Sequence, residues 1–202
     1  DPVVFAQIRT DGVWNTEPGG AHNLLRFMKK TLNVKANYLT RTVKLDTDPL
    51  ADYSFLYLSG LSDFTLNPAE AFALRGYLTS GGYLLIDNSL GLEEFHQAVS
   101  REMKKVLPDS AFARLPPGHA VFLQGPFKLD AVRYTLAARA RHPTLTTPLI
   151  EVLNVDGQAR VLYSPFDLAA GWQGEEHPLS YGYETADALR LGANLITYCL
   201  TH

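Results

Sequence analysis

The sequence predicts an α/β protein with three layers, α/β/α, around a mostly parallel sheet of flavodoxin-like strand order. Strand-like runs alternate with helical patterns through the first half of the chain, which favours right-handed βαβ crossovers. Near the C-terminus the dipeptide Asp156-Gly157 joins two further strand-like runs, which predicts a hairpin. With 202 residues, 46% of them apolar, the chain can bury one good core. We therefore expect a single domain over residues 1–202.

The first half of the chain supplies the alternation of strands and helices. Strands are expected over residues 3–8, 36–43, 55–58 and 83–86. Between the first two, apolar residues recur at helical spacing from Leu24 to Leu32. A further helix is expected over about 92–107, because its acidic residues come first and its lysines last, as the helix dipole favours.

The helix expected between residues 67 and 80 has the clearest end signals. Asn67 is a good N-cap, Pro68 suits the first helical position, and Glu70 can complete a capping box. Gly81 provides a left-handed stop. This helix therefore connects the third and fourth strands as a crossover.

The second half is less regular until the hairpin. Prolines and mixed patterns from about 115 to 149 predict irregular structure with one or two short strands. The hairpin should add one parallel strand and an antiparallel neighbour near the C-terminus. A closing helix over about 184–200 would bury Ala188, Leu191, Leu195 and Cys199.

Composition argues against several functional classes. The net charge is −3, and the lysine pairs are isolated at helix ends, so the sequence gives no support for nucleic-acid binding. No apolar run reaches the roughly 18 residues of a membrane span. The single cysteine excludes an intrachain disulfide. Because glycine-rich phosphate loops and metal-binding motifs are also missing from the sequence, we expect no cofactor and no metal.

Polar residues follow several of the predicted strands, and in this fold class they meet at the carboxyl edge of the sheet. Acidic and amide groups beside two tryptophans would suit a polar small molecule such as a sugar. The candidate ligand-binding residues are Asp11, Trp14, Asn15, Ser59, Gly60, Asp63, Asp87, Asn88, Asp167 and Trp172. Glu175, Glu176 and His177 lie in the loop after the last of these strands. Asp, Asn and Ser at such positions are also ordinary turn and capping residues.

Asp87 has a second possible role as part of a hydrolytic site. Asp87 or Ser89 could act as nucleophile or base, assisted by a loop histidine such as His177. Gly91 matches the second glycine of a nucleophile elbow, but Asp87 stands where the first is required. His96 is expected on the exposed face of its helix.

The segments YSFLYLSG, LNPAEAFALRGYLTSGGYLLIDNSLG and FHQAVSREMKKVLPD resemble an uncharacterised bacterial family of domains of unknown function. The RTDGVWN loop, the HAVF segment and SPFDLAAGW match its pattern too, so the resemblance spans nearly the whole chain. That family resembles a distant branch of the class I glutamine amidotransferase-like fold, near the trehalose-utilisation-like domains. In such amidotransferases the strand that corresponds to residues 83–86 of this chain leads to a nucleophilic cysteine. In this chain the same strand leads to Asp87-Asn88-Ser89. The resemblance therefore argues against thioester chemistry.

The resemblance also implies export or attachment to larger envelope proteins. The start at Asp1, without an initiator methionine, favours a removed leader and an exported location, periplasmic or envelope-associated, with a cytoplasmic one still open. Three functions follow. The favoured one is a non-catalytic ligand-binding or interaction module, and the alternatives are a hydrolase and an assembly module with an envelope protein partner.

Overall fold

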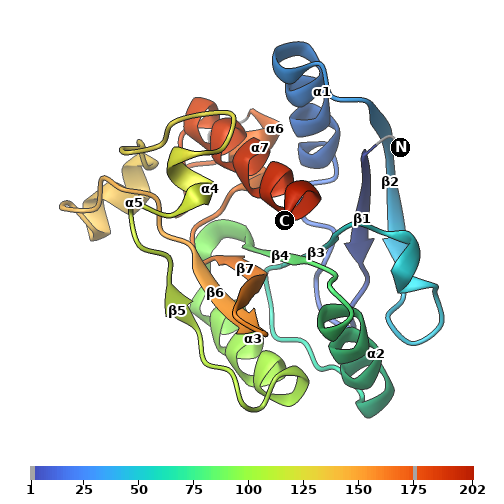
Figure 1. Cartoon of the computed structure of the whole chain (residues 1–202). Coiled ribbons are helices and arrows are strands. Elements are labelled where there is room, and N and C mark those ends of the chain that lie inside the picture. Colours follow the sequence, from blue (N-terminus) through green and yellow to red (C-terminus); the bar gives the residue numbers. More distant parts are fainter. Residues whose placement is uncertain (1–2, 175–176) are drawn as a thin grey trace.

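Seven strands form one sheet at the centre of the computed structural model, which describes residues 3–174 and 177–202 (Figure 1). The strand order is β2-β1-β3-β4-β7-β6-β5. The five parallel strands are β1 (Val3–Ile8), β2 (Ala36–Val43), β3 (Leu56–Gly60), β4 (Leu84–Asn88) and β7 (Gln158–Ser164). Their order is the flavodoxin-like one that the sequence predicts.

Two antiparallel strands complete the sheet on the far side of β7. β6 (Glu151–Val155) pairs with β7, and the two-residue β5 (Ala113–Arg114) pairs with β6. The turn between β6 and β7 has φ of 50° at Asp156 and 77° at Gly157. Both values lie in the left-handed region that a tight hairpin turn requires, so the predicted hairpin is confirmed.

Helices cover both faces of the sheet and define two cores. α1 (Gly20–Leu32), α6 (Ala169–Gln173) and α7 (Thr185–Thr201) lie on one face, and α2 (Pro68–Thr79) and α3 (Glu93–Val106) on the other (Figure 1). We call these the α1/α7 core and the α2/α3 core. The three-layer architecture is therefore confirmed.

The pleat of β4 sends successive side chains to opposite cores. Leu84 and Ile86 lie in the α2/α3 core, and Leu85 lies in the α1/α7 core. Since the period of a strand is two, Asp87 continues toward α6 and Asn88 toward α3. This alternation decides the surroundings of both polar residues.

Local signals fix the ends of the helices well. The Asn67 side chain accepts hydrogen bonds from the N–H groups of Ala69 and Glu70, at 2.9 and 3.0 Å. The Glu70 carboxylate accepts one from the N–H of Asn67 at 2.7 Å, so the capping box is formed as predicted. The predicted inner stripe of α7 is buried.

Two expectations about the strands and helices need correction. β3 and β4 run two residues further than predicted, to Gly60 and Asn88, so Asp87 and Asn88 belong to the strand rather than to the loop after it. Short 3-10 turns are formed by η1 (Leu50–Asp52) and η2 (Ser89–Gly91). The irregular middle of the chain contains two short helices, α4 (Ala120–Leu123) and α5 (Leu136–Arg141), instead of the expected strands.

None of the helices within residues 3–174 and 177–202 combines the length and the apolar character needed to cross a bilayer.

Candidate functional site

Asp87 lies at the end of β4 and is completely buried. Its Oδ1 accepts a hydrogen bond from the N–H of Leu168 at 2.9 Å. Its Oδ2 accepts from the N–H of Ala169 at 2.9 Å and from the Tyr57 hydroxyl at 3.0 Å. Burial, and then the nearby Asp167, raises the pKa of this carboxyl well above 3.8. Asp87 therefore joins β4 to the beginning of α6 from inside the core.

Asp167 stabilises the opposite side of the same junction. It is also fully buried, and its Oδ1 accepts from the N–H of Ala170 at 3.0 Å. Its Oδ2 accepts from the N–H of Leu90 at 2.9 Å and the Ser180 hydroxyl at 2.8 Å. Desolvation by burial raises its pKa. We call Asp87 and Asp167 the inner carboxylates, since both hold backbone segments together and neither reaches solvent.

The other small residues of the edge are also occupied by internal contacts. The Ser89 hydroxyl is 1% exposed and shares a hydrogen bond of 2.7 Å with the Thr16 hydroxyl. Ser59 donates to the carbonyl oxygen of Trp14 at 2.9 Å. At Gly60 a Cβ atom would lie 2.4 Å from the Phe95 ring, so only glycine fits there without a shift. These three residues pack the loops after β1, β3 and β4 together.

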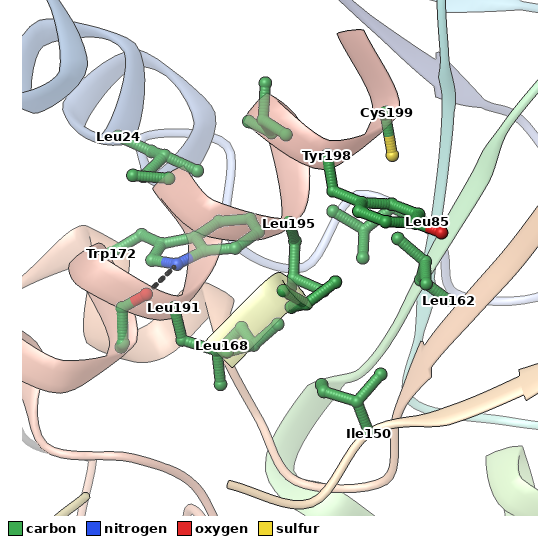
Figure 2. Packing of buried hydrophobic residues seen from close by; sticks show 14 of the residues in the cluster. Leu24, Leu85, Ile150, Leu162, Leu168, Trp172, Leu191, Leu195, Tyr198 and Cys199 are labelled. Carbon is green, nitrogen blue, oxygen red and sulfur yellow. Dashed lines mark hydrogen bonds between the residues drawn. The ribbon is translucent and has the colours of Figure 1, made fainter. Parts of the chain in front are cut away.

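Trp172 does not line a crevice, contrary to the sequence prediction. It belongs to α6, is 1% exposed, and packs in the α1/α7 core among Leu24, Leu168 and Leu191 (Figure 2). Its Nε1 donates to the carbonyl oxygen of Ala188 at 2.9 Å. The loop expected after β7 forms a short helix that turns this ring inward. Trp14, in the loop after β1, is half-buried.

The exposed candidates lie apart from the inner carboxylates. Asp63 pairs with Arg101 at 2.7 Å, and this hydrogen bond lowers the pKa of Asp63. Asp11 accepts from the N–H of Thr65 at 2.9 Å, and Asn15 is exposed. His177 lines a separate, partly apolar cavity of about 410 Å³ beside α5 and the start of α7. Glu175 and Glu176 lie outside the described residues.

An open cleft of about 210 Å³ lies at the carboxyl edge, between the start of α3 and the segments around residues 141–142, 165–166 and 181. Asn88 forms part of the lining of this cleft. The Asn88 side chain also hydrogen-bonds to the backbone of the following turn. Its Nδ2 donates to the carbonyl oxygen of Leu92 at 3.0 Å, and its Oδ1 accepts from the N–H of Leu92 at 2.9 Å. Of the predicted ligand-binding residues, Asn88 is the one that this cleft contains.

Three polar side chains at this cleft are each held by an aromatic ring. We call His96, Arg141 and His142 the cleft set. His96 stacks on Tyr163, with Nδ1 2.9 Å from the hydroxyl, and the Arg141 guanidinium lies 4.2 Å above the centre of the Tyr181 ring. His142 contacts Phe166 edge to face, with ring centres 5.7 Å apart. The aromatic partners restrict the conformations of these side chains.

His96 differs from its predicted position. It is half-buried at the first turn of α3 and lines the cleft, rather than lying on the exposed face of the helix. Stacking on Tyr163, a buried residue of β7, holds its ring against the sheet.

The turn that borders the cleft is strained. Leu90 has φ of 59°, in the left-handed region where a leucine costs about 1 kcal/mol or more, and Gly91 follows with φ of 67°. The Leu90 N–H bonds to Asp167, and the Leu90 carbonyl oxygen accepts from the N–H of Tyr181 at 3.2 Å. A Cβ at Gly91 would lie 2.7 Å from the Tyr181 carbonyl oxygen. An inner carboxylate therefore fixes the wall of the open cleft.

The geometry gives no support to a hydrolytic site at Asp87 or Ser89. In the described part of the chain, no histidine hydrogen-bonds to either residue, and their partners are backbone groups, Tyr57 and Thr16. Residues 3–174 and 177–202 also contain no cluster of three potential metal ligands. Cys199 is buried in α7, and burial raises the pKa of its thiol well above the ordinary value. A buried, protonated thiol is a poor nucleophile.

Sequence reasoning missed Arg141 and Tyr181. They come from segments without a periodic pattern, and the structure brings these segments to the edge through two isolated bridges. These bridges pair Tyr134 with Tyr183 and Asp167 with Gly182. No local sequence signal marks such long-range pairs.

The fold and cleft define an α/β domain of flavodoxin-like strand order with an open polar cleft at the carboxyl edge of its sheet. The chain belongs to the family described as a domain of unknown function, DUF4159, which matches residues 4–200. A search of curated proteins gives no significant match.

Proposed function

We propose that this chain is a non-catalytic module that binds a polar small molecule in the cleft at the carboxyl edge. The observation that carries the proposal is the cleft set, three polar side chains held in place by aromatic rings around a volume of about 210 Å³. The strained Leu90-Gly91 turn beside it supports the same assignment, because backbone strain tends to be kept at functional sites.

The sequence resemblance to the class I glutamine amidotransferase-like fold forms part of this proposal. The parallel strand order and the cleft at the strand ends support a distant relationship. At the position of the expected nucleophile, the chain has Asp87-Asn88-Ser89, and all three side chains are buried and hydrogen-bonded. Such a site would retain the binding cleft of the fold without its covalent chemistry.

A thermal-shift screen tests the binding proposal. Sugars, amino acids, nucleotides and carboxylic acids would be added to the wild type and to His142→Trp, which fills the cleft with a larger ring. A ligand at a hundred times its dissociation constant should stabilise the wild type by roughly 2.7 kcal/mol and leave His142→Trp unchanged. The matched control is His177→Trp at the other cavity, which should respond like the wild type. Equal stabilisation of all three proteins would contradict the proposal.

A second function, an assembly module of an envelope complex, is favoured by one other observation. Leu136 and Leu179 are 76% and 67% exposed, and Leu136 lines the separate cavity of about 410 Å³ together with Ala140 and Pro178. Exposed apolar side chains beside a cavity are typical of protein interaction sites. The corresponding location would be exported, periplasmic or envelope-associated. Size-exclusion chromatography with light scattering tests self-association through this surface, which Leu136→Ser should weaken.

A further inference from the structure

We infer that the ligand in the cleft carries an anionic group, a carboxylate or a phosphate, bound by Arg141 together with His96 and His142. This inference rests on the proposed binding function and adds the chemical class of the ligand.

Arg141 differs from the arginines that form ion pairs and resembles Arg160, whose guanidinium lies 4.5 Å above the centre of the Tyr83 ring. Arg101 pairs with Asp63 at 2.7 Å, Arg139 with Glu184 at 3.6 Å, and Arg190 with Asp187 at 3.5 Å. Within residues 3–174 and 177–202, Arg141 has no carboxylate within 4 Å and lies over the Tyr181 ring. Stacking occupies the flat face of a guanidinium and leaves the N–H groups at its edge for an oxyanion.

One of the two neutral tautomers of His96 carries a hydrogen-bond donor at Nε2. The Tyr163 hydroxyl accepts from Asn88 Nδ2 at 3.4 Å and lies 2.9 Å from His96 Nδ1. When this hydroxyl donates its own proton to Nδ1, the proton of the neutral ring is carried by Nε2. A protonated Nε2 on this cleft residue is a hydrogen-bond donor, which suits an acceptor-only group such as a carboxylate or a phosphate.

Two acidic residues stand in the first turn of α3, and one of them, Glu93, belongs to the lining of the cleft. Glu93 Oε1 accepts from Gln97 Nε2 at 3.1 Å, one turn further along α3. Glu94 Oε1 accepts from the N–H of Asp63 at 3.2 Å. The charges of Glu93 and Glu94 oppose the favourable potential of the N–H groups in this first turn, so the inference depends on Arg141 and the two histidines rather than on the helix N-terminus.

The cleft volume limits the size of the bound part. A volume of about 210 Å³ lies below the roughly 300 Å³ of the smallest drug-sized sites, so the cleft accommodates the anionic group and a few attached atoms. A planar, bidentate partner such as Arg141 would dominate the recognition of such a group.

Isothermal titration calorimetry tests the inference with inorganic phosphate, succinate and glucose, at constant ionic strength. The proteins are the wild type, Arg141→Gln, His96→Gln and Arg139→Gln. Arg139→Gln is the matched control, since it removes the same charge from the same helix outside the cleft. We expect phosphate or succinate to bind the wild type and Arg139→Gln equally. Binding should be at least tenfold weaker in Arg141→Gln and severalfold weaker in His96→Gln. The tighter anion identifies the group as phosphate or carboxylate.

Other results overturn the inference in distinguishable ways. Equal anion affinity in Arg141→Gln and the wild type would mean that the anions bind outside the cleft. A second result would be that a neutral ligand such as glucose binds the wild type but not His142→Trp, while no anion binds. In that case the anionic class of the ligand is wrong and the binding function stands. If neither the anions nor the neutral compounds of the thermal-shift screen bind the wild type, both proposals are overturned.

Discussion

The inner carboxylates and the cleft set lie at the same edge of the sheet, yet their surroundings are opposite. Asp87 and Asp167 are fully buried, and each accepts three hydrogen bonds from the chain itself. His96, Arg141 and His142 border an open cleft and are held mainly by aromatic contacts. Polar residues at a strand end can therefore be fully occupied by internal hydrogen bonds, while the polar groups that border an open cleft come from other segments.

The largest expected effect is the loss of an inner carboxylate. Asp87→Ala would leave two backbone N–H groups and the Tyr57 hydroxyl without an acceptor in the core. We expect the free energy of unfolding to fall by about 3–5 kcal/mol. Urea unfolding followed by circular dichroism measures it. Asp63→Ala, at an exposed position, is the control and should remain close to the wild type. A loss below about 1 kcal/mol in Asp87→Ala would show that Asp87 does not support the fold.

Asp87→Asn keeps the shape of the side chain. We therefore expect the free energy of unfolding to fall by a smaller amount, about 1–3 kcal/mol at neutral pH. Because the folded state raises the pKa of Asp87, protonation stabilises the folded wild type below pH 3.8, and this contribution is lost as pH rises through the folded-state pKa. The asparagine variant lacks this contribution. The stability difference between the two proteins should therefore be larger at pH 4 than at pH 8.

Urea titrations of both proteins between pH 4 and pH 8 measure this difference. A difference that does not change with pH, or that grows toward pH 8, would show that the pKa of Asp87 is not raised in the folded protein.

Ser89 belongs with the inner residues, and Ser89→Ala should behave accordingly. Loss of its buried hydrogen bond to Thr16 is expected to cost about 1 kcal/mol, without changing any ligand-induced thermal shift. Thermal unfolding with and without a ligand from the screen checks both parts. Unchanged stability together with lost binding would move Ser89 to the cleft set.

The smallest effect on stability is expected for the cleft set. Arg141→Gln removes an exposed contact with Tyr181, and we expect less than about 1 kcal/mol of destabilisation. Urea unfolding of the unliganded protein measures it, beside Arg139→Gln. A loss comparable to that of Asp87→Ala would show that Arg141 supports the fold, and the distinction between the two groups would disappear.

The sequence predicts the fold well where the signals are local or follow from chain topology. The capping box at Asn67, the left-handed turn at Asp156-Gly157 and the buried stripe of α7 each depend on neighbouring residues. The right-handed crossover rule restricts the possible orders of the parallel strands. These features need no knowledge of distant contacts.

The site is less predictable because its contacts join distant segments. Trp172 follows a strand in the sequence, and such a position predicts a loop. In the structure it belongs to the short helix α6, which places its ring in the core. Arg141 and His142 end a short helix whose place at the edge depends on pairing between segments about 50 residues apart, such as Tyr134 with Tyr183. Periodicity and turn signals contain no information on such contacts.

The hydrogen bonds that Asp87 accepts from the N–H groups of Leu168 and Ala169 also affect the order of folding. They join residues separated by 81 and 82 positions. A five-residue helix is too short to persist alone, so α6 gains order only after β4 and β7 have paired. Contacts between such distant residues close late because of the entropy of the intervening loop. We therefore expect Trp172 to reach its native environment in the last stage of folding, which stopped-flow fluorescence can follow.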